Sequence, residues 1–196
     1  KLIIQVPCYN EAQTLEIALN HLPKHIDGID EIEYLIINDG SRDDTVKVAK
    51  NWGVNYVVNF RTNRGLAKGS WQAGCLPAKR CGYHCQYRML MISTAEMTSK
   101  LVRPILEEKA DIVIGERPID DTEHFSPLKK KLQHFGSWTV RVASKSDIPD
   151  APSGFRAYSR DAAMRLNVTN EYTYTLETII QAGRTRMAME SCRSAP

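Results

Sequence analysis

The sequence predicts an α/β fold, in which a mostly parallel central sheet lies between two layers of helices. Short apolar runs rich in Ile, Val and Leu alternate along the chain with segments of helical periodicity. A strand–helix–strand order of this kind makes consecutive strands parallel and packs the helices on both faces of the sheet. The polar loops after the strands should then meet at one edge of the sheet, where α/β proteins bind ligands.

The first 73 residues contain the most regular part of this pattern. A buried strand is predicted at 1–6, and Pro7 should end it. The next helix should begin near Asn10 and close before Pro23. The elements predicted after it are strands at 33–37 and 54–58, a helix at 45–52 with Gly53 as its C-cap, and a helix at about 66–73.

The later elements are less regular. We expect a helix at 101–108, a strand at 110–115 and a further helix around Glu177. Residues 118–152 are polar and contain several prolines, which indicates a mobile loop with one helix near 128–143. Neither 75–100 nor the tail from Ser191 fits a strand or helix pattern. We expect a single domain over residues 1–196, truncated at its C-terminus.

Composition and charge exclude several classes of protein. The chain has 196 residues, 42% of them hydrophobic and 25% charged, which is ordinary for a globular domain. A net charge of +3 is too small to indicate a nucleic-acid-binding protein. No apolar run reaches the length of a membrane helix, and no signal peptide precedes the first strand. The five cysteines follow no disulfide framework, so we expect a reduced, cytoplasmic setting.

Two loops at the predicted ligand edge combine an aromatic ring with polar and acidic side chains. The first loop offers Pro7, Tyr9, Asn10 and Glu11, and the second offers Asp39, Ser41, Asp43 and Asp44. A ring beside carboxylates can stack a nucleotide base and hold ribose hydroxyls. For Asp43 and Asp44 the favoured interpretation is structural, because acids in the first turn of a helix suit its dipole. Asp39 directly follows a strand, where this structural explanation is weaker.

Several motifs together resemble the family 2 glycosyltransferases of the GT-A fold, especially those that act on polyprenyl phosphates. They are V-P-C-Y-N-E, Y-L-I-I-N-D-G-S-R-D-D-T, N-R-G-L-A-K-G, A-D-I-V-I-G-E-R-P and S-G-F-R-A-Y-S-R-D. The resemblance covers nearly the whole chain apart from 75–100. It implies a Rossmann-like, three-layer α/β/α GT-A domain.

The resemblance also implies roles for individual residues. Nucleotide binding falls to Pro7, Tyr9, Asn10, Glu11, Asp39, Ser41, Asn63 and Gly65. The sugar and acceptor side falls to Ser153, Gly154, Phe155 and Arg156, and the catalytic positions are Arg117 and Glu177. A guanidinium can form paired bonds to diphosphate oxygens, although a single Arg is more often a solvated surface residue. An ordinary helix-face carboxylate is an equally good interpretation of Glu177.

The implied reaction transfers a sugar, with inversion, from a UDP- or GDP-sugar to a polyprenyl phosphate or to a hydroxyl of a glycan or lipid. An acidic membrane surface is a possible further partner, and no nucleic acid is expected. Two other classes remain open. A binding protein could retain the nucleotide pocket without turnover. A nucleotidyltransferase is disfavoured, because no glycine-rich phosphate loop follows the first strand.

The family also implies Mg²⁺ or Mn²⁺, held by an Asp-x-Asp after the fourth strand. This sequence has no such pair, and between Gly65 and Glu107 the only acid is Glu96. The strand pattern expected before this pair is also absent, since the only apolar run of the segment, at 88–92, leads to Ser93 and Thr94. A zinc site formed by Cys75, Cys81, His84 and Cys85 is disfavoured, because the adjacent His84 and Cys85 suit one tetrahedral centre poorly.

A shift of reading frame is one explanation of the anomalous segment 75–100. Residues 82–88 can be encoded as GGA TAT CAT TGT CAA TAC CGA. Read one base later, this DNA encodes D-I-I-V-N-T and then a codon that starts GA, for Asp or Glu. That reading is a buried strand that ends in an acid, as the family requires. If the residues are a faithful product, the metal-binding strand is lost.

Overall fold

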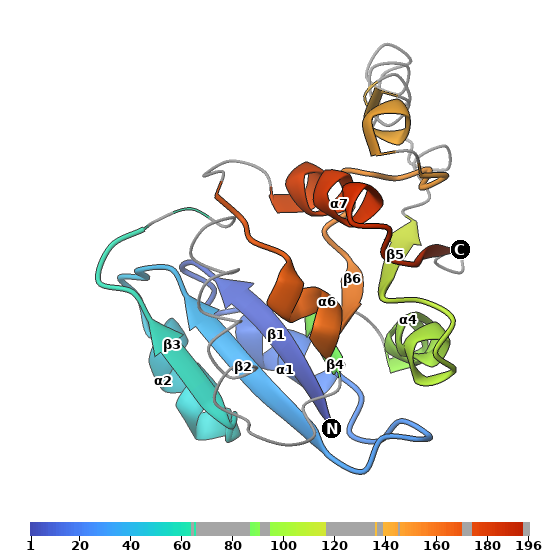
Figure 1. Ribbon diagram of the computed structural model, residues 1–196. Coiled ribbons are helices and arrows are strands. Elements are labelled where there is room, and N and C mark those ends of the chain that lie inside the picture. Colours follow the sequence, from blue (N-terminus) through green and yellow to red (C-terminus); the bar gives the residue numbers. More distant parts are fainter. Residues whose placement is uncertain are drawn as a thin grey trace, which may run out of the picture.

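The computed structural model describes residues 1–63, 65, 87–90, 95–116, 136, 139–144, 146–169 and 174–193, with only the backbone described at 87–90 and 95. Its centre is one sheet with the strand order β3-β2-β1-β4-β6-β5-β7 (Figure 1). The strands are β1 Leu2–Cys8, β2 Ile32–Asn38, β3 Tyr56–Asn59, β4 Tyr87–Leu90, β5 Ile112–Glu116, β6 Arg156–Ser159 and β7 Met189–Arg193. Only β6 runs antiparallel to its neighbours, β4 and β5. The predicted mostly parallel sheet is confirmed.

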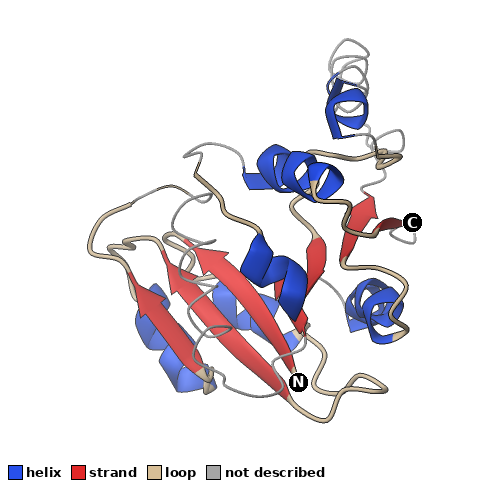
Figure 2. Ribbon diagram, viewed as in Figure 1, coloured by secondary structure: helices blue, strands red, loops and turns tan. Residues whose placement is uncertain are grey.

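Helices cover both faces of this sheet (Figure 2). The side chains of α1 Leu15–Asn20, α2 Thr45–Trp52 and α4 Ala95–Leu106 share one core with Leu2, Ile4 and Val6 of β1. On the opposite face, α6 Arg160–Arg165 and α7 Tyr174–Arg184 pack with Ile112 and Ile114 of β5. Side chains alternate across a strand, and this alternation lets each buried strand serve two cores. The architecture is therefore the expected three-layer α/β/α arrangement.

The first strand extends past the residue that was expected to end it. Pro7 lies inside β1, opposite Ile37 of β2. Among the described residues, the pairing of β1 with β4 extends only to Gln5, so no described partner needs an N–H from position 7 on that side. The strand therefore carries Cys8 to the sheet edge, and Tyr9 is the first residue beyond it.

Two predictions about irregular segments are wrong. A fourth strand is present: β4, Tyr87–Leu90, pairs in parallel with Leu2–Gln5 at the centre of the sheet. The tail is regular as far as Arg193, because β7 pairs with β5 along Ile112–Glu116. Both strands are short and gain stability from neighbours far away in sequence, which local patterns do not reveal. The predicted helix at 66–73 lies outside the described residues. Within the predicted helix at 128–143, residues 136 and 139–143 are helical where described.

Candidate functional site

The loops after β1, β2 and β3 lie at the same edge of the sheet, because these three strands are parallel neighbours. Hydrogen bonds join the first loop to the second. The backbone N–H of Asn10 donates to Ser41 Oγ at 2.8 Å, and the Arg42 N–H donates to Asn10 Oδ1 at 2.9 Å. Asn10 adopts a left-handed φ of 55°, which asparagine tolerates better than most residues. In the described contacts, Asn10 and Ser41 thus connect the two loops.

A second pair of contacts joins the same loops closer to α2. The Glu11 N–H donates to Thr45 Oγ1 at 2.9 Å, and the Ala12 N–H donates to Asp43 Oδ2 at 3.1 Å. The hydroxyl of Thr45 also donates to Asp43, and this bond is the main reason why the pKa of Asp43 is lowered. These contacts support the structural interpretation of Asp43. Asp44 occupies the N-cap position of α2 but makes no side-chain capping bond.

Asp39 joins the second loop to the third. Its carboxylate is nearly buried, with 8% of the residue exposed, and its Oδ2 accepts the Gly65 N–H at 3.0 Å. The same Gly65 N–H lies 3.1 Å from Asn63 Oδ1. Gly40 has a φ of 79°, and a Cβ at this position would lie only 2.6 Å from the backbone carbon of Thr62. The second and third loops therefore approach so closely that position 40 accepts only glycine.

Tyr9 and Glu11 project from this joined framework. Tyr9 is 46% exposed, and Glu11 is exposed although its carboxylate accepts a bond from the Thr14 hydroxyl. Pro7 is half-buried below them. The neighbouring Cys8 is buried, and this burial is the main cause that raises its thiol pKa to about 12. The surface thus offers an aromatic face and carboxylates but no thiolate nucleophile at position 8.

The predicted sugar-side residues form a second group, beside the end of β5. Ser153 Oγ donates to the carbonyl of Gly115 at 2.6 Å, and the Gly115 N–H donates to Phe155 O at 2.8 Å. A Cβ at Gly115 would overlap the ring of Phe155, at 2.2 Å from Cδ1. The carbonyl of Gly154 accepts a 3.4 Å bond from the Tyr174 hydroxyl. The segment 153–155 is therefore packed between β5 and the start of α7.

Arg156 is placed differently from the ligand-facing cation that was expected. It is fully buried, and its guanidinium donates to protein oxygens of neighbouring segments. Glu177 lies on α7 as predicted, and its carboxylate accepts bonds from the N–H and hydroxyl of Thr169. Both side chains therefore hold structure in the described contacts. Arg117 lies outside the described residues.

The residues that the structure describes provide no site for the metal that the family implies. Within the described part of the chain, no group of three or more His, Cys, Asp or Glu side chains could hold an ion. The four residues after β4 are Met91, Ile92, Ser93 and Thr94, which supply no carboxylate. Cys75, Cys81, His84 and Cys85, the disfavoured zinc ligands, lie outside the described residues.

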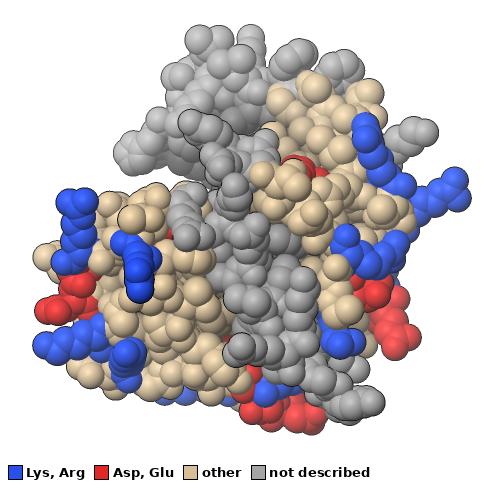
Figure 3. All heavy atoms as spheres, turned by 60° about the vertical axis from the view of Figure 1, so that its left-hand side comes forward, with Lys and Arg blue, Asp and Glu red and all other residues tan. Residues whose placement is uncertain are grey.

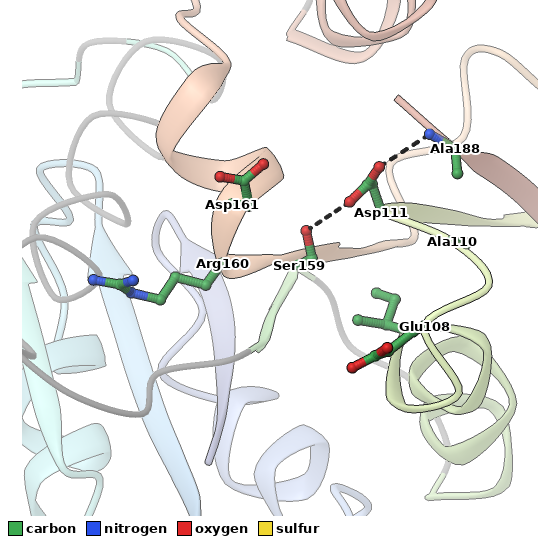
Figure 4. Close-up of a pocket in the computed structure, with 8 residues that line it drawn as sticks. Glu108, Ala110, Asp111, Ser159, Arg160, Asp161 and Ala188 are labelled. Atoms are coloured by element: carbon green, nitrogen blue, oxygen red, sulfur yellow. Dashed lines mark hydrogen bonds between the residues drawn. The ribbon is translucent and has the colours of Figure 1, made fainter. Parts of the chain in front are cut away.

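A hollow of about 300 Å³ lies at the opposite edge of the sheet, where β5 begins and β6 ends (Figure 4). Its Asp111 accepts bonds from the Ala188 N–H and from the Ser159 hydroxyl, so this carboxylate joins β5, β6 and β7. The guanidinium of Arg160 points away from Asp111 in this view (Figure 4). The hollow is therefore separate from the loops that follow β1, β2 and β3.

The charged surface agrees with the small net charge. On the face shown in Figure 3, Lys and Arg side chains lie beside acidic ones at both margins of the molecule. Among the helices that the structure describes, none has the length and apolar character needed to cross a bilayer.

Known proteins resemble the chain in sequence. Residues 3–73 match the family model described as glycosyl transferase family 2. A dolichyl-phosphate beta-glucosyltransferase from Trichomonas vaginalis is 29% identical over 181 residues, which cover 82% of this chain and 54% of that protein. A UDP-N-acetylglucosamine–dolichyl-phosphate N-acetylglucosaminyltransferase from Methanococcus voltae is 25% identical over 178 residues, covering 80% and 68%.

A solved structure resembles the chain in fold. Glucosyl-3-phosphoglycerate synthase from Mycobacterium tuberculosis, in complex with Mn²⁺, UDP-glucose and phosphoglyceric acid, aligns with a TM-score of 0.74 at 16% identity. The alignment covers 98% of this chain and 69% of that one. The chain spans between 30% and 68% of the length of the curated relatives it matches. The predicted resemblance is thus confirmed: this is a GT-A protein similar to the family 2 glycosyltransferases, including enzymes named for dolichyl phosphate.

Proposed function

We propose that the chain is the sugar-transfer domain of a glycosyltransferase that uses a UDP-sugar and a lipid-phosphate acceptor. One observation carries this proposal. The residues that match the family model, 3–73, are those whose loops are joined at the carboxyl ends of β1, β2 and β3. That edge is where ligands bind in open α/β sheets. The names of the two dolichyl-phosphate relatives favour a lipid-phosphate acceptor.

The exposed ring and the carboxylates fit the parts of a uridine nucleotide. Tyr9 is available to stack on the base, since nearly half of it is exposed. Asp39 and Glu11 are acceptors suited to the N–H of uracil and to the ribose hydroxyls. UDP is favoured over GDP because UDP-sugars appear in the names of a relative and of the structural neighbour.

The proposed step is a direct displacement with inversion at the anomeric carbon of the sugar. A phosphate oxygen of the acceptor forms the new bond, the bond from that carbon to UDP breaks, and its electron pair leaves with the diphosphate. A phosphate acceptor is already anionic and needs no general base. Glu177, whose carboxylate accepts a bond from the Thr169 hydroxyl, therefore has no proton to remove in this step. Arg117 stays a predicted partner of the departing diphosphate.

The absent carboxylate pair favours a second candidate function, a nucleotide-sugar-binding protein without turnover. Residues 66–95 contain no acid. Sequencing the coding DNA across codons 74–100 separates the two functions. A frame shift that restores Asp-x-Asp would identify the gene product as a metal-dependent transferase. DNA that confirms the residues as written would favour the binding function.

The transfer reaction is tested with UDP-[¹⁴C]glucose and a short polyprenyl phosphate in detergent micelles. We expect labelled glucose in the lipid phase, and no label there when the alcohol without phosphate replaces the acceptor. Mn²⁺ should be compared with a chelator in parallel. If UDP-glucose binds but no labelled lipid forms under either condition, the transfer proposal is wrong and the binding function stands. A membrane-surface location stays a prediction.

A further inference from the structure

We propose that Arg156 is a positioning residue that fixes the sugar-side loop 151–155 against α7, and that it does not bind the donor itself. This inference rests on the proposed function. It starts from an unusual feature of Arg156, because a fully buried arginine normally pairs with a carboxylate. Among the described residues, the four hydrogen bonds that the Arg156 guanidinium donates all end on carbonyl or hydroxyl oxygens.

The guanidinium connects two segments. On the loop side, Nε donates to Ser153 O at 2.7 Å and Nη2 donates to Ala151 O at 2.6 Å. On the α7 side, Nη1 donates to Thr175 O at 2.7 Å and to Thr178 Oγ1 at 2.8 Å. Four of the five N–H groups of a guanidinium are thereby engaged inside the protein. A phosphate cannot reach these groups unless the loop moves.

The bonds of Arg156 satisfy backbone groups that regular structure leaves without partners. Ala151 and Ser153 lie in neither a helix nor a strand, so their buried carbonyls need donors from elsewhere. Tyr174 adds a third such bond, from its hydroxyl to Gly154 O. Thr178 completes the connection, because its hydroxyl accepts from Arg156 and donates to Tyr174 O at 2.8 Å. We call this set, Arg156, Tyr174 and Thr178 with the carbonyls of 151, 153 and 154, the arginine clamp.

The sheet order places the clamp where the sugar of a bound donor should lie. The nucleotide loops follow β3, β2 and β1, while loop 151–155 leads into β6, two strands beyond β1. At the usual strand spacing this separation is about 10 Å. A donor whose base lies over the first loops therefore extends toward the clamp with its sugar. Ser153 and Phe155 are also fixed to Gly115 of β5, so the clamp sets the distance between β5 and α7 at this point.

If the clamp fixes the sugar-side loop, a change of Arg156 should weaken binding of the sugar part of the donor and leave binding of UDP almost unchanged. Arg156→Met keeps a long side chain but removes every donor, and Arg156→Lys keeps the charge without the planar fork. We expect calorimetry to give a UDP Kd within about twofold of wild type for both. The extra affinity for UDP-glucose over UDP should fall at least fivefold in Arg156→Met. Hydrogen exchange should become faster in residues 151–155 and in the first turn of α7.

Two further variants keep the test valid if Arg156→Met does not fold. Thr178→Val removes one acceptor of the clamp at almost constant shape, and Thr178→Ser retains it. We expect Thr178→Val to reduce the preference for UDP-glucose two- to threefold, and Thr178→Ser to restore it. Arg165→Met is the matched control, because Arg165 lies on the neighbouring α6 in an exposed pair with Asp161. It should change neither the binding preference nor the exchange of 151–155.

These measurements distinguish a failure of the proposed function from a failure of the clamp proposal. A wild-type chain that does not bind UDP would contradict the proposed function. Wild-type binding of UDP and UDP-glucose, with an unchanged preference in Arg156→Met, would overturn the clamp alone. A parallel loss of UDP and UDP-glucose affinity would also overturn it, because a general folding defect lowers both equally.

Discussion

The ligand edge of the sheet is built in two different ways. Beside β1, β2 and β3, short side chains accept bonds from backbone N–H groups of neighbouring loops, as the half-buried Ser41 and the buried Thr45 do for Asn10 and Glu11. Beside β5 and β6, one fully buried guanidinium donates to the carbonyls of its neighbours. In the first part, side chains accept bonds from backbone N–H groups that regular structure leaves unpaired. In the second part, a side chain donates bonds to backbone carbonyls that regular structure leaves unpaired.

This difference separates the consequences expected of substitutions. In the first part, the bonds between loops are shared among several short side chains, such as Ser41, Thr45 and Asp43, so a change at one of them should affect one loop contact. In the second part, Arg156 joins two segments, so its loss should release both. The close approach at Gly40 is the exception in the first part, since a Cβ there would meet backbone atoms of the third loop.

Gly40→Ala should have the largest effect, and Gly53→Ala is its matched control. Both glycines have positive φ, but nothing lies within 4 Å of a Cβ at Gly53. We expect Gly53→Ala to lower the free energy of unfolding by about 1 kcal/mol. Gly40→Ala adds an overlap with Thr62 and should lower it by about 3 kcal/mol. It should also weaken UDP binding, measured by calorimetry. Equal losses of stability in the two variants would contradict the close approach of these loops.

Tyr9→Ala should have the next largest effect, on UDP affinity without an equal effect on stability. Stacking of a base on an aromatic ring contributes about 1–3 kcal/mol, so the Kd for UDP should rise roughly 5- to 100-fold. Tyr9→Phe keeps the ring and should stay within about twofold of wild type. The role of Tyr9 in stacking is refuted if Tyr9→Ala binds UDP as wild type does.

The substitution Asp43→Asn should have the smallest effect, which should be a change in how the free energy of unfolding depends on pH. Its pKa is lowered in the folded chain, chiefly by the Thr45 hydroxyl. The resulting stabilisation is present above the unfolded pKa of about 3.9 and is lost as the pH falls through the lower, folded pKa. Between about pH 6 and about pH 3, wild type should lose more free energy of unfolding than Asp43→Asn. Parallel pH profiles would argue against this contact.

The sequence predicted the first part of the edge better than the second. Its loops follow strong strand patterns, and the motifs around Tyr9 and Asp39 are local. The contacts of Asn10 and Ser41 with each other were not predictable, because they depend on the left-handed φ of Asn10. A signal that could have found them is the polar character of both residues in adjacent loops.

Arg156 shows why the second part was harder to predict. A charged residue beside a ligand edge is expected in solvent or on a phosphate. Its burial depends on Thr175 and Thr178, which lie about twenty residues later in the chain. β6 was not predicted for a related reason, since it is a four-residue strand that begins with this arginine. Its stability comes from pairing with β4 and β5, which no local pattern contains.

The central claim is that the joined loops after β1, β2 and β3 bind the nucleotide of a UDP-sugar. A calorimetric titration of UDP into wild type and Asp39→Ala, with Asp44→Ala as an exposed control, tests it most directly. We expect wild type and Asp44→Ala to bind one UDP per chain. Asp39→Ala should lose roughly 10- to 100-fold in affinity, because a carboxylate bonded to the base or ribose contributes about 1.5–3 kcal/mol. Absence of UDP binding to wild type, or equal affinities in the three proteins, would contradict the account.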